Sequence, residues 1–140
     1  MADVVYNEFK EKLLSAGVNF SSDTIKVALV TSSYTPNQDT HDNFDDVTNE
    51  VTGTGYTAGG ATLASKTISQ DDTDNEGVFD AADVTWSSST ITAAAAVLYK
   101  DTGTPSSSTL IAYFDFGGNQ VSSNGNFTLQ WAAEGIINLT

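Results

Sequence analysis

Two spacings of apolar residues divide the chain. From Asp3 to Gly17 the apolar positions recur about every 3.6 residues, which is the period of an amphipathic helix. These positions are Val5, Tyr6, Phe9, Leu13 and Leu14. Asp3 is a residue type that caps the start of a helix, and Gly17 one that ends it, so the pattern predicts a helix at about residues 3–17. Beyond Gly17 the period changes to two, as in strands with one buried face.

The period of two predicts a chain of short strands. In residues 24–31, Ile25, Val27 and Leu29 fall on one side and Lys26 on the other, as in a strand with one buried face. The alanine-rich run 91–99 is expected to be a central strand packed on both faces. Residues 110–116 and 126–131 are expected to be consecutive antiparallel strands joined through the turn Gly117-Gly118-Asn119, with a last strand at 136–139. Roughly seven or eight strands of this kind predict an antiparallel β-sandwich or small barrel. We therefore expect one mainly β domain over residues 1–140, β-rich from 22 to 140, with one N-terminal helix.

Two connections between the predicted strands are long. A polar segment from Ser32 to Asp46 contains Phe44, which can anchor the loop on the core. Residues 51–60 hold four glycines, but neither the context nor a following lysine fits a phosphate-binding loop. These glycines are expected to provide turns with positive φ or a close approach of two backbones.

Charge narrows the possible partners. The 140 residues include 18 acidic and 5 basic side chains, for a net charge of −13, with no arginine and no cysteine. Binding to nucleic acid or to an anionic membrane depends on Lys and Arg, so we expect neither partner. Without arginine, phosphoryl-transfer chemistry is disfavoured, and without cysteine there are no disulfides or thiolate metal ligands. No apolar run has the length of a signal peptide or membrane span, so synthesis in a cytoplasm is expected.

One acidic segment has the ligand spacing of a calcium-binding loop. From Asp72 to Asp83, oxygen-bearing residues occupy positions 1, 3 and 5, glycine position 6 and a carboxylate position 12. Against calcium, position 12 is Asp instead of Glu, and no amphipathic helix flanks the segment. The alternative is a solvated acidic hairpin loop. We assign no metal and no cofactor.

Evidence for catalysis is weak. His41 is the single histidine, it stands in a polar segment, and no Gly-x-Ser-x-Gly motif marks a partner serine, so an exposed loop residue is expected. Among 18 acids a pair at glycosidase distance can occur by chance. Trp86, Trp131 and the tyrosines could form a platform for sugars, although such residues more commonly lie in a core or interface. We expect a protein that is not an enzyme.

Four segments carry a resemblance. They are Ser22–Tyr34, Asn49–Leu63, Ala82–Trp86 and Val97–Gly103. The second of them begins with the sequence Asn-Glu-Val-Thr-Gly-Thr-Gly-Tyr-Thr-Ala-Gly-Gly. They resemble a family of small virion structural proteins of tailed bacteriophages, over nearly the whole chain. The resemblance implies a capsid decoration or cement protein on the outer surface of the virion. Its partners would be the major capsid protein and further copies of itself, for instance in a trimer.

A role of this kind requires contact surfaces and no catalytic group. The helix at 3–17 and the loop at 32–46 are the expected contacts with the shell or between copies. The interface residues expected are Tyr6, Phe9, Tyr34, Phe44 and Tyr56. The alternative is a tail or fibre component, such as a module that binds host glycans. In either role the acidic surface would face outward, with the few lysines and aromatics marking the contacts.

Overall fold

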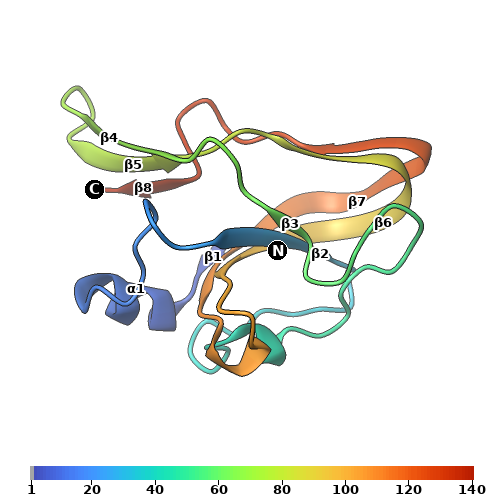
Figure 1. The fold of residues 1–140 in the computed structure, drawn as a ribbon, viewed down its shortest axis with the longest axis horizontal. Helices are drawn as coiled ribbons and strands as arrows, with labels where there is room; N and C mark the ends of the chain where they lie inside the picture. Colours follow the sequence, from blue (N-terminus) through green and yellow to red (C-terminus); the bar gives the residue numbers. More distant parts are fainter. Residues whose placement is uncertain (1) are drawn as a thin grey trace.

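The protein is mainly β, as predicted, in a computed structural model that describes residues 2–140. Two antiparallel sheets have the strand orders β1-β7-β6-β2-β3 and β4-β5-β8, consistent with a β-sandwich-like fold (Figure 1). The strands are β1 (Val4–Val5), β2 (Ile25–Val30), β3 (Ala61–Thr62), β4 (Thr67–Asp71), β5 (Glu76–Asp80), β6 (Val84–Lys100), β7 (Leu110–Leu129) and β8 (Ile137–Leu139). One α-helix, α1 (Asn7–Leu14), and two short 3-10 turns, Phe44–Asp46 and Pro105–Ser107, complete the fold.

The two long strands β6 and β7 form one hairpin that runs through both layers. Figure 1 shows the paired ribbons turning back on themselves at one end of the molecule. The turn falls where the pairing register shifts between Trp86 and Ile91, and where Ser88 and Asn124 have positive φ values of 49° and 47°. The hairpin therefore has an upper arm, which pairs residues 84–86 with 127–129, and a lower arm that pairs β6 with the rest of β7.

Two buried serines lie at this turn. The Ser89 and Ser122 hydroxyl oxygens are 2.8 Å apart, and Ser89 Oγ also lies 2.9 Å from the carbonyl oxygen of Trp86 and 3.0 Å from that of Gly125. The backbone N–H of Ile91 donates to Ser122 Oγ. These bonds replace the ladder bonds that the turn interrupts, which keeps the buried backbone groups paired.

The turn expected at residues 117–119 is wrong. Asp115 pairs with Ala95 and Gln120 with Ala93, so residues 116–119 form a bulge opposite a single residue of β6. Gly117 and Gly118 have φ values of 77° and 154°. Residues 110–116 and 126–129 thus belong to one strand, and both pair with β6 instead of with each other.

The central strands are packed on both faces, as expected for the alanine-rich run. On one face the buried side chains of β2 and β6 belong to the core between the layers, which includes Val27, Leu29, Ala96 and Leu98. On the other face a second buried cluster lies beneath the long loop and includes Ala28, Val30, Ala95 and Val97. Phe44 stacks on Tyr99 with ring centroids 4.1 Å apart, so its predicted role as the loop anchor is confirmed.

The helix is shorter than the predicted 3–17. Val4 and Val5 instead form β1, which pairs with Tyr113 and Ala112 of β7. Asp3 does not cap the helix, because its Oδ1 accepts the backbone N–H of Asp115. The predicted helix included Val4 and Val5 because a strand of two residues is too short to show an alternating pattern of its own.

Candidate functional site

Three of the five predicted interface residues lie in the interior. Tyr6, Phe9 and Tyr34 are 0%, 2% and 2% exposed, and Phe44 and Tyr56 are half-buried. Phe9 packs on Phe20 in the main core, with ring centroids 5.7 Å apart. Each of these three side chains is thus covered by its own chain, which leaves it little surface for the partner contact that was predicted.

Tyr6 and Tyr34 hold the long loop through a directed hydrogen-bond chain. The two hydroxyl oxygens are 2.9 Å apart, and Tyr34 Oη lies 2.9 Å from His41 Nδ1. Since the backbone N–H of Asn37 also donates to this Nδ1, the nitrogen is an acceptor, so Tyr34 donates to it and Tyr6 donates to Tyr34. Burial raises the pKa of both tyrosines. His41, expected to be exposed, is half-buried and positions the loop.

Tyr56 fastens the glycine-rich segment to β2. Its hydroxyl donates to Glu50 Oε2 at 2.6 Å and accepts the backbone N–H of Leu29 at 3.0 Å. Burial, followed by the bond to Glu50, raises its pKa. At Gly60 (φ +79°) a Cβ would lie 1.9 Å from the carbonyl oxygen of Val27. The expected close approach of two backbones is confirmed at this glycine.

The twelve-residue calcium loop does not form. Residues 72–75 make the turn of the β4–β5 hairpin, and residues 76–80 continue as strand β5, so they cannot wrap around an ion. Asp83, the expected ligand at position 12, lies just before β6, and its Oδ1 accepts the backbone N–H of Trp131. Carboxylate oxygens of Asp71, Asp74 and Glu76 lie within 4.8 Å of one another, the one such group among residues 2–140. Asp71 Oδ1 is already occupied by backbone N–H groups of the turn.

The two tryptophans differ in accessibility. Trp86 is 6% exposed and lies edge-on to Phe127 in the core, so it cannot stack on a sugar. Trp131 is half-buried, donates from Nε1 to the carbonyl oxygen of Ala82 and lies edge-on to Phe114. Only the Trp131 half of the predicted sugar platform is at the surface.

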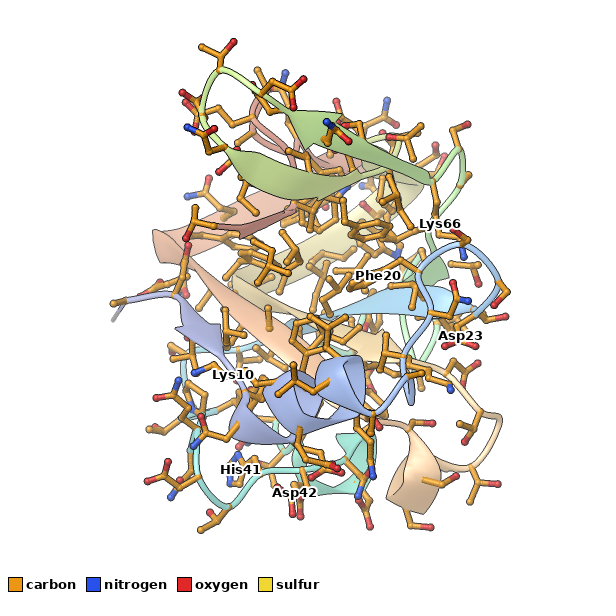
Figure 2. The ribbon with its side chains drawn as sticks, turned by 90° about the vertical axis from the view of Figure 1, so that its left-hand side faces the viewer. Lys10, Phe20, Asp23, His41, Asp42 and Lys66 are labelled. Atoms are coloured by element: carbon orange, nitrogen blue, oxygen red, sulfur yellow. The ribbon has the colours of Figure 1, made fainter. Side chains whose placement is uncertain are left out.

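Most lysines are held within the chain. Lys12 pairs with Glu8 at 3.3 Å, Lys26 with Asp101 at 3.7 Å and Lys100 with Asp23 at 3.2 Å. The ammonium of Lys66 donates to the carbonyl oxygen of Asp23, on the turn that Figure 2 shows beside it. The expectation that lysines mark the contact surface thus lacks support, because three of these four pair with acids of the same chain and Lys66 bonds to its backbone.

An apolar groove opens between α1 and the small sheet. Its volume is about 360 Å³, and Figure 2 shows Phe20 between the helix and strands β4 and β5. It is lined mainly by apolar side chains, among them Leu13, Val18, Phe20, Val78, Phe79 and Ile137. Ile68 and Leu139 in its lining are 56% and 61% exposed, and Leu14 on the adjoining helix end is 91% exposed. Sequence reasoning missed this groove because it assigned Leu13 and Leu14 together to the buried face.

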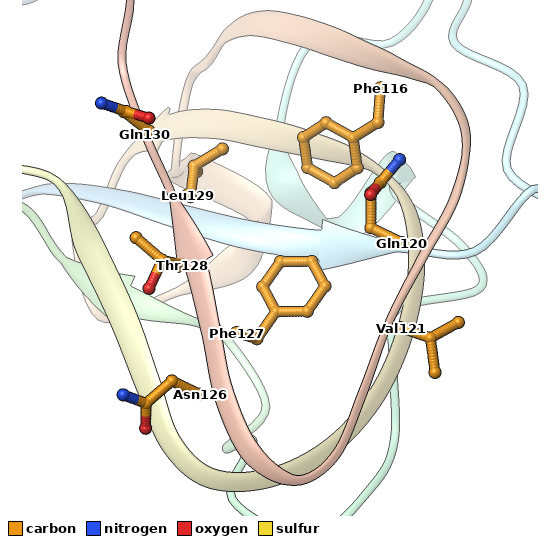
Figure 3. A pocket seen from close by; sticks show the side chains of 8 residues that line it. All are labelled: Phe116, Gln120, Val121, Asn126, Phe127, Thr128, Leu129 and Gln130. Atoms are coloured by element: carbon orange, nitrogen blue, oxygen red, sulfur yellow. The ribbon is translucent and has the colours of Figure 1, made fainter.

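A second cleft, of about 350 Å³, lies between the two arms of β7. Figure 3 shows the rings of Phe116 and Phe127 directed into it, with centroids 6.3 Å apart. The other lining residues are Gln120, Val121, Asn126, Thr128, Leu129 and Gln130. None of the eight carries a charge. We call it the β7 cleft. The sequence signal for it is that no acidic residue occurs between Asp115 and Glu134.

Among residues 2–140, no helix has the length and apolar character needed to cross a membrane. Comparison with protein-family models, with curated proteins and with solved structures gives no match to this chain.

Proposed function

We propose that this chain is a non-enzymatic structural protein of a tailed-bacteriophage virion, a decoration protein that binds the outer surface of the capsid shell. The observation that carries the proposal is the open apolar groove on a chain with a net charge of −13. Large exposed apolar side chains gathered around a groove are typical of protein contact sites. An acidic remainder keeps such a protein soluble and away from packaged nucleic acid.

The phage-like segments also fit a structural role. Segments 22–34, 49–63 and 97–103 meet in the fold, since Tyr99 donates to the carbonyl oxygen of Gly59 and Gly60 lies against β2. They determine how the long loop packs on the sheet. The resemblance therefore concerns the framework of the protein and supplies no catalytic residue.

The shell subunit is the proposed occupant of the groove. Helix α1 contributes Leu13 and Leu14 to this contact, while its inward aromatics hold the helix on the sheet. This replaces the earlier expectation that aromatic side chains of the helix and loop make the contact. The groove is suited to an apolar segment of the shell protein, because its floor of Phe20 and Phe79 is apolar and rigidly stacked, with centroids 4.1 Å apart.

Reconstitution tests the proposal. Purified chain is added to phage shells that lack it, and bound copies are counted by electron microscopy. Leu14→Asp combined with Ile68→Asp should weaken binding at least tenfold, about 1.4 kcal/mol, because two charges would enter an apolar contact. Ser106→Asp, at an exposed position outside the groove, is the matched control and should bind like the natural chain. Equal occupancy by the groove variant, or a location on the tail, would contradict the proposal.

A second candidate is a tail or fibre module that binds glycans. The observation in its favour is a shallow cavity of about 280 Å³ that includes Trp131, Gln130 and Asp3. An aromatic ring beside amide and carboxylate groups can bind a sugar. Binding on a glycan array that Trp131→Ala abolishes, together with a tail location, would favour this module over decoration.

A further inference from the structure

The outer edge of β7 is the long strand edge that the fold leaves open. β1 pairs with β7 only at Tyr113 and Ala112, and no other described strand pairs with its outer side as far as Leu129. Because the hairpin is folded, this edge borders both layers, with the β7 cleft between them (Figure 3). An open edge presents unpaired N–H and C=O groups to any strand that approaches.

The same edge lacks the usual protection against pairing. Proteins block exposed edges with charged side chains or proline, or keep the edge strand very short. Residues 116–133 contain neither charge nor proline, and Val121 is 68% exposed. The other described edges differ: β1, β3 and β8 have two or three residues, and β4 is flanked by Lys66 and Asp72. The bulge at 116–119 interrupts the lower arm between the pairs Ala95–Asp115 and Ala93–Gln120, so the edge proposed to pair lies beyond it, from Gln120 onward.

Charge distribution identifies the occupant. Residues 84–99 and 116–133 are uncharged, so the folded end of the hairpin is neutral in a chain with a net charge of −13. Two copies that met through acidic faces would bring carboxylates together, and like charges repel. Through the β7 edge they meet without this repulsion. The apolar groove is uncharged as well, but only the β7 edge adds backbone N–H and C=O groups of a strand that a second copy can pair, so the second copy is placed here.

We propose that two copies of this chain associate through the outer edges of β7, around a two-fold axis, with Val121 of each copy against the β7 cleft of the other. A two-fold pair requires one self-complementary edge, whereas a ring requires a second, different edge. On the opposite side of the hairpin the glycine-rich segment interrupts that second edge at Ser89 and Thr90, since the backbone N–H of Thr90 donates to the carbonyl oxygen of Thr54 and Gly55 lies against Ser89. The pair replaces the trimer expected from the sequence, and it does not depend on the shell contact.

Light scattering and sedimentation of the full chain test the pair. The natural chain should shift from monomer to dimer mass as concentration rises. Added salt should tighten the dimer, because it screens repulsion between the acidic remainders. Val121→Asp should raise the dissociation constant at least tenfold. Leu139→Asp places the same charge at an equally apolar position, 61% exposed in the groove, and should leave the dimer intact.

Cross-linking tests the symmetry, because the chain has no cysteine of its own. Val121→Cys should form a disulfide-linked dimer on mild oxidation, since residues near a two-fold axis meet their own copies. Leu139→Cys should form no disulfide-linked dimer, although its non-covalent pair is retained. A monomer at millimolar concentration, a trimer mass, or dissociation by Leu139→Asp and not by Val121→Asp would overturn the inference. A monomer that still decorates shells would remove the pair and leave the proposed function standing.

Discussion

Replacing Ser89 with alanine should unfold the protein more easily by an amount that the hydrogen bonds predict. Ser89 is 0% exposed, and its hydroxyl joins Ser122 to the carbonyl groups of Trp86 and Gly125. Each hydroxyl has one proton: Ile91 donates to Ser122, Ser122 to Ser89, and Ser89 to one carbonyl. Alanine removes the last link and leaves the hydroxyl of Ser122, itself 5% exposed, without its acceptor.

The expected loss of unfolding free energy is about 1–3 kcal/mol, the usual cost of a buried polar group that loses its partner. For a domain of this size it corresponds to a melting temperature lowered by roughly 3–10 °C. Urea denaturation followed by tryptophan fluorescence measures the change directly, because Trp86 lies beside the bend.

Two controls make the result specific. Ser87→Ala, at an exposed neighbouring position, should change the free energy by less than about 0.5 kcal/mol. The double variant Ser89→Ala with Ser122→Ala should cost less than the sum of the single changes, because it removes both members of the bonded pair. If Ser89→Ala costs no more than Ser87→Ala, the serines do not hold the bend and the reasoning is refuted.

Three further predictions concern the loops. Gly60→Ala should destabilise the chain far more than Gly103→Ala, because Gly103 also has a positive φ (+86°) but no atom lies within 4 Å of its added carbon. Equal losses in urea denaturation would show that the glycine-rich segment does not rest on β2. Tyr34→Phe should cost about 1–3 kcal/mol in the same assay, because buried Tyr6 Oη loses its acceptor and His41 Nδ1 keeps only the N–H of Asn37. No loss would contradict the directed chain. Alkaline pH should also destabilise the fold. Burial raises the pKa of Tyr56 above the ordinary 10.0, so the folded state favours the neutral phenol. The stability that this provides is present below about pH 10 and is lost as the pH rises further. Thermal melts across this range should show a smaller decline for Tyr56→Phe.

Strand periodicity was sufficient to predict the fold class but not the folded hairpin. The alternation in residues 25–29 and the small side chains of 93–96 correctly indicated a strand with a buried face and a central strand. Ser87-Ser88-Ser89 and Gly117-Gly118-Asn119 have the composition of turns, yet one is a bend and the other a bulge within continuous strands. Local composition cannot distinguish a turn between two strands from a bend or bulge within one strand. The two differ in whether the residues on either side pair with the same partner strand.

The candidate surfaces were harder to predict than the core. Tyr6 and Tyr34 satisfy each other's hydroxyls and are buried, whereas Leu14 is almost fully exposed, although hydrophobicity alone suggests the reverse. Which aromatic finds a partner for its hydroxyl depends on residues far away in sequence. The uncharged stretch after Asp115 was visible beforehand, but its meaning depended on the absence of a neighbouring strand.

The folded hairpin also determines when this chain can fold during its synthesis. β1 emerges first from the ribosome, but its partner residues are 112 and 113, and the partners of β2 in the hairpin lie at 95–100. Apart from the β4–β5 hairpin, the two residue pairs between β2 and β3 and the bridge between Val30 and Glu50, every strand pairing among residues 2–140 waits for the last third of the chain. Domains with such distant pairings fold slowly and expose their apolar segments meanwhile. The strong negative charge, concentrated before residue 84, is therefore expected to limit aggregation of the nascent chain until its final strands arrive.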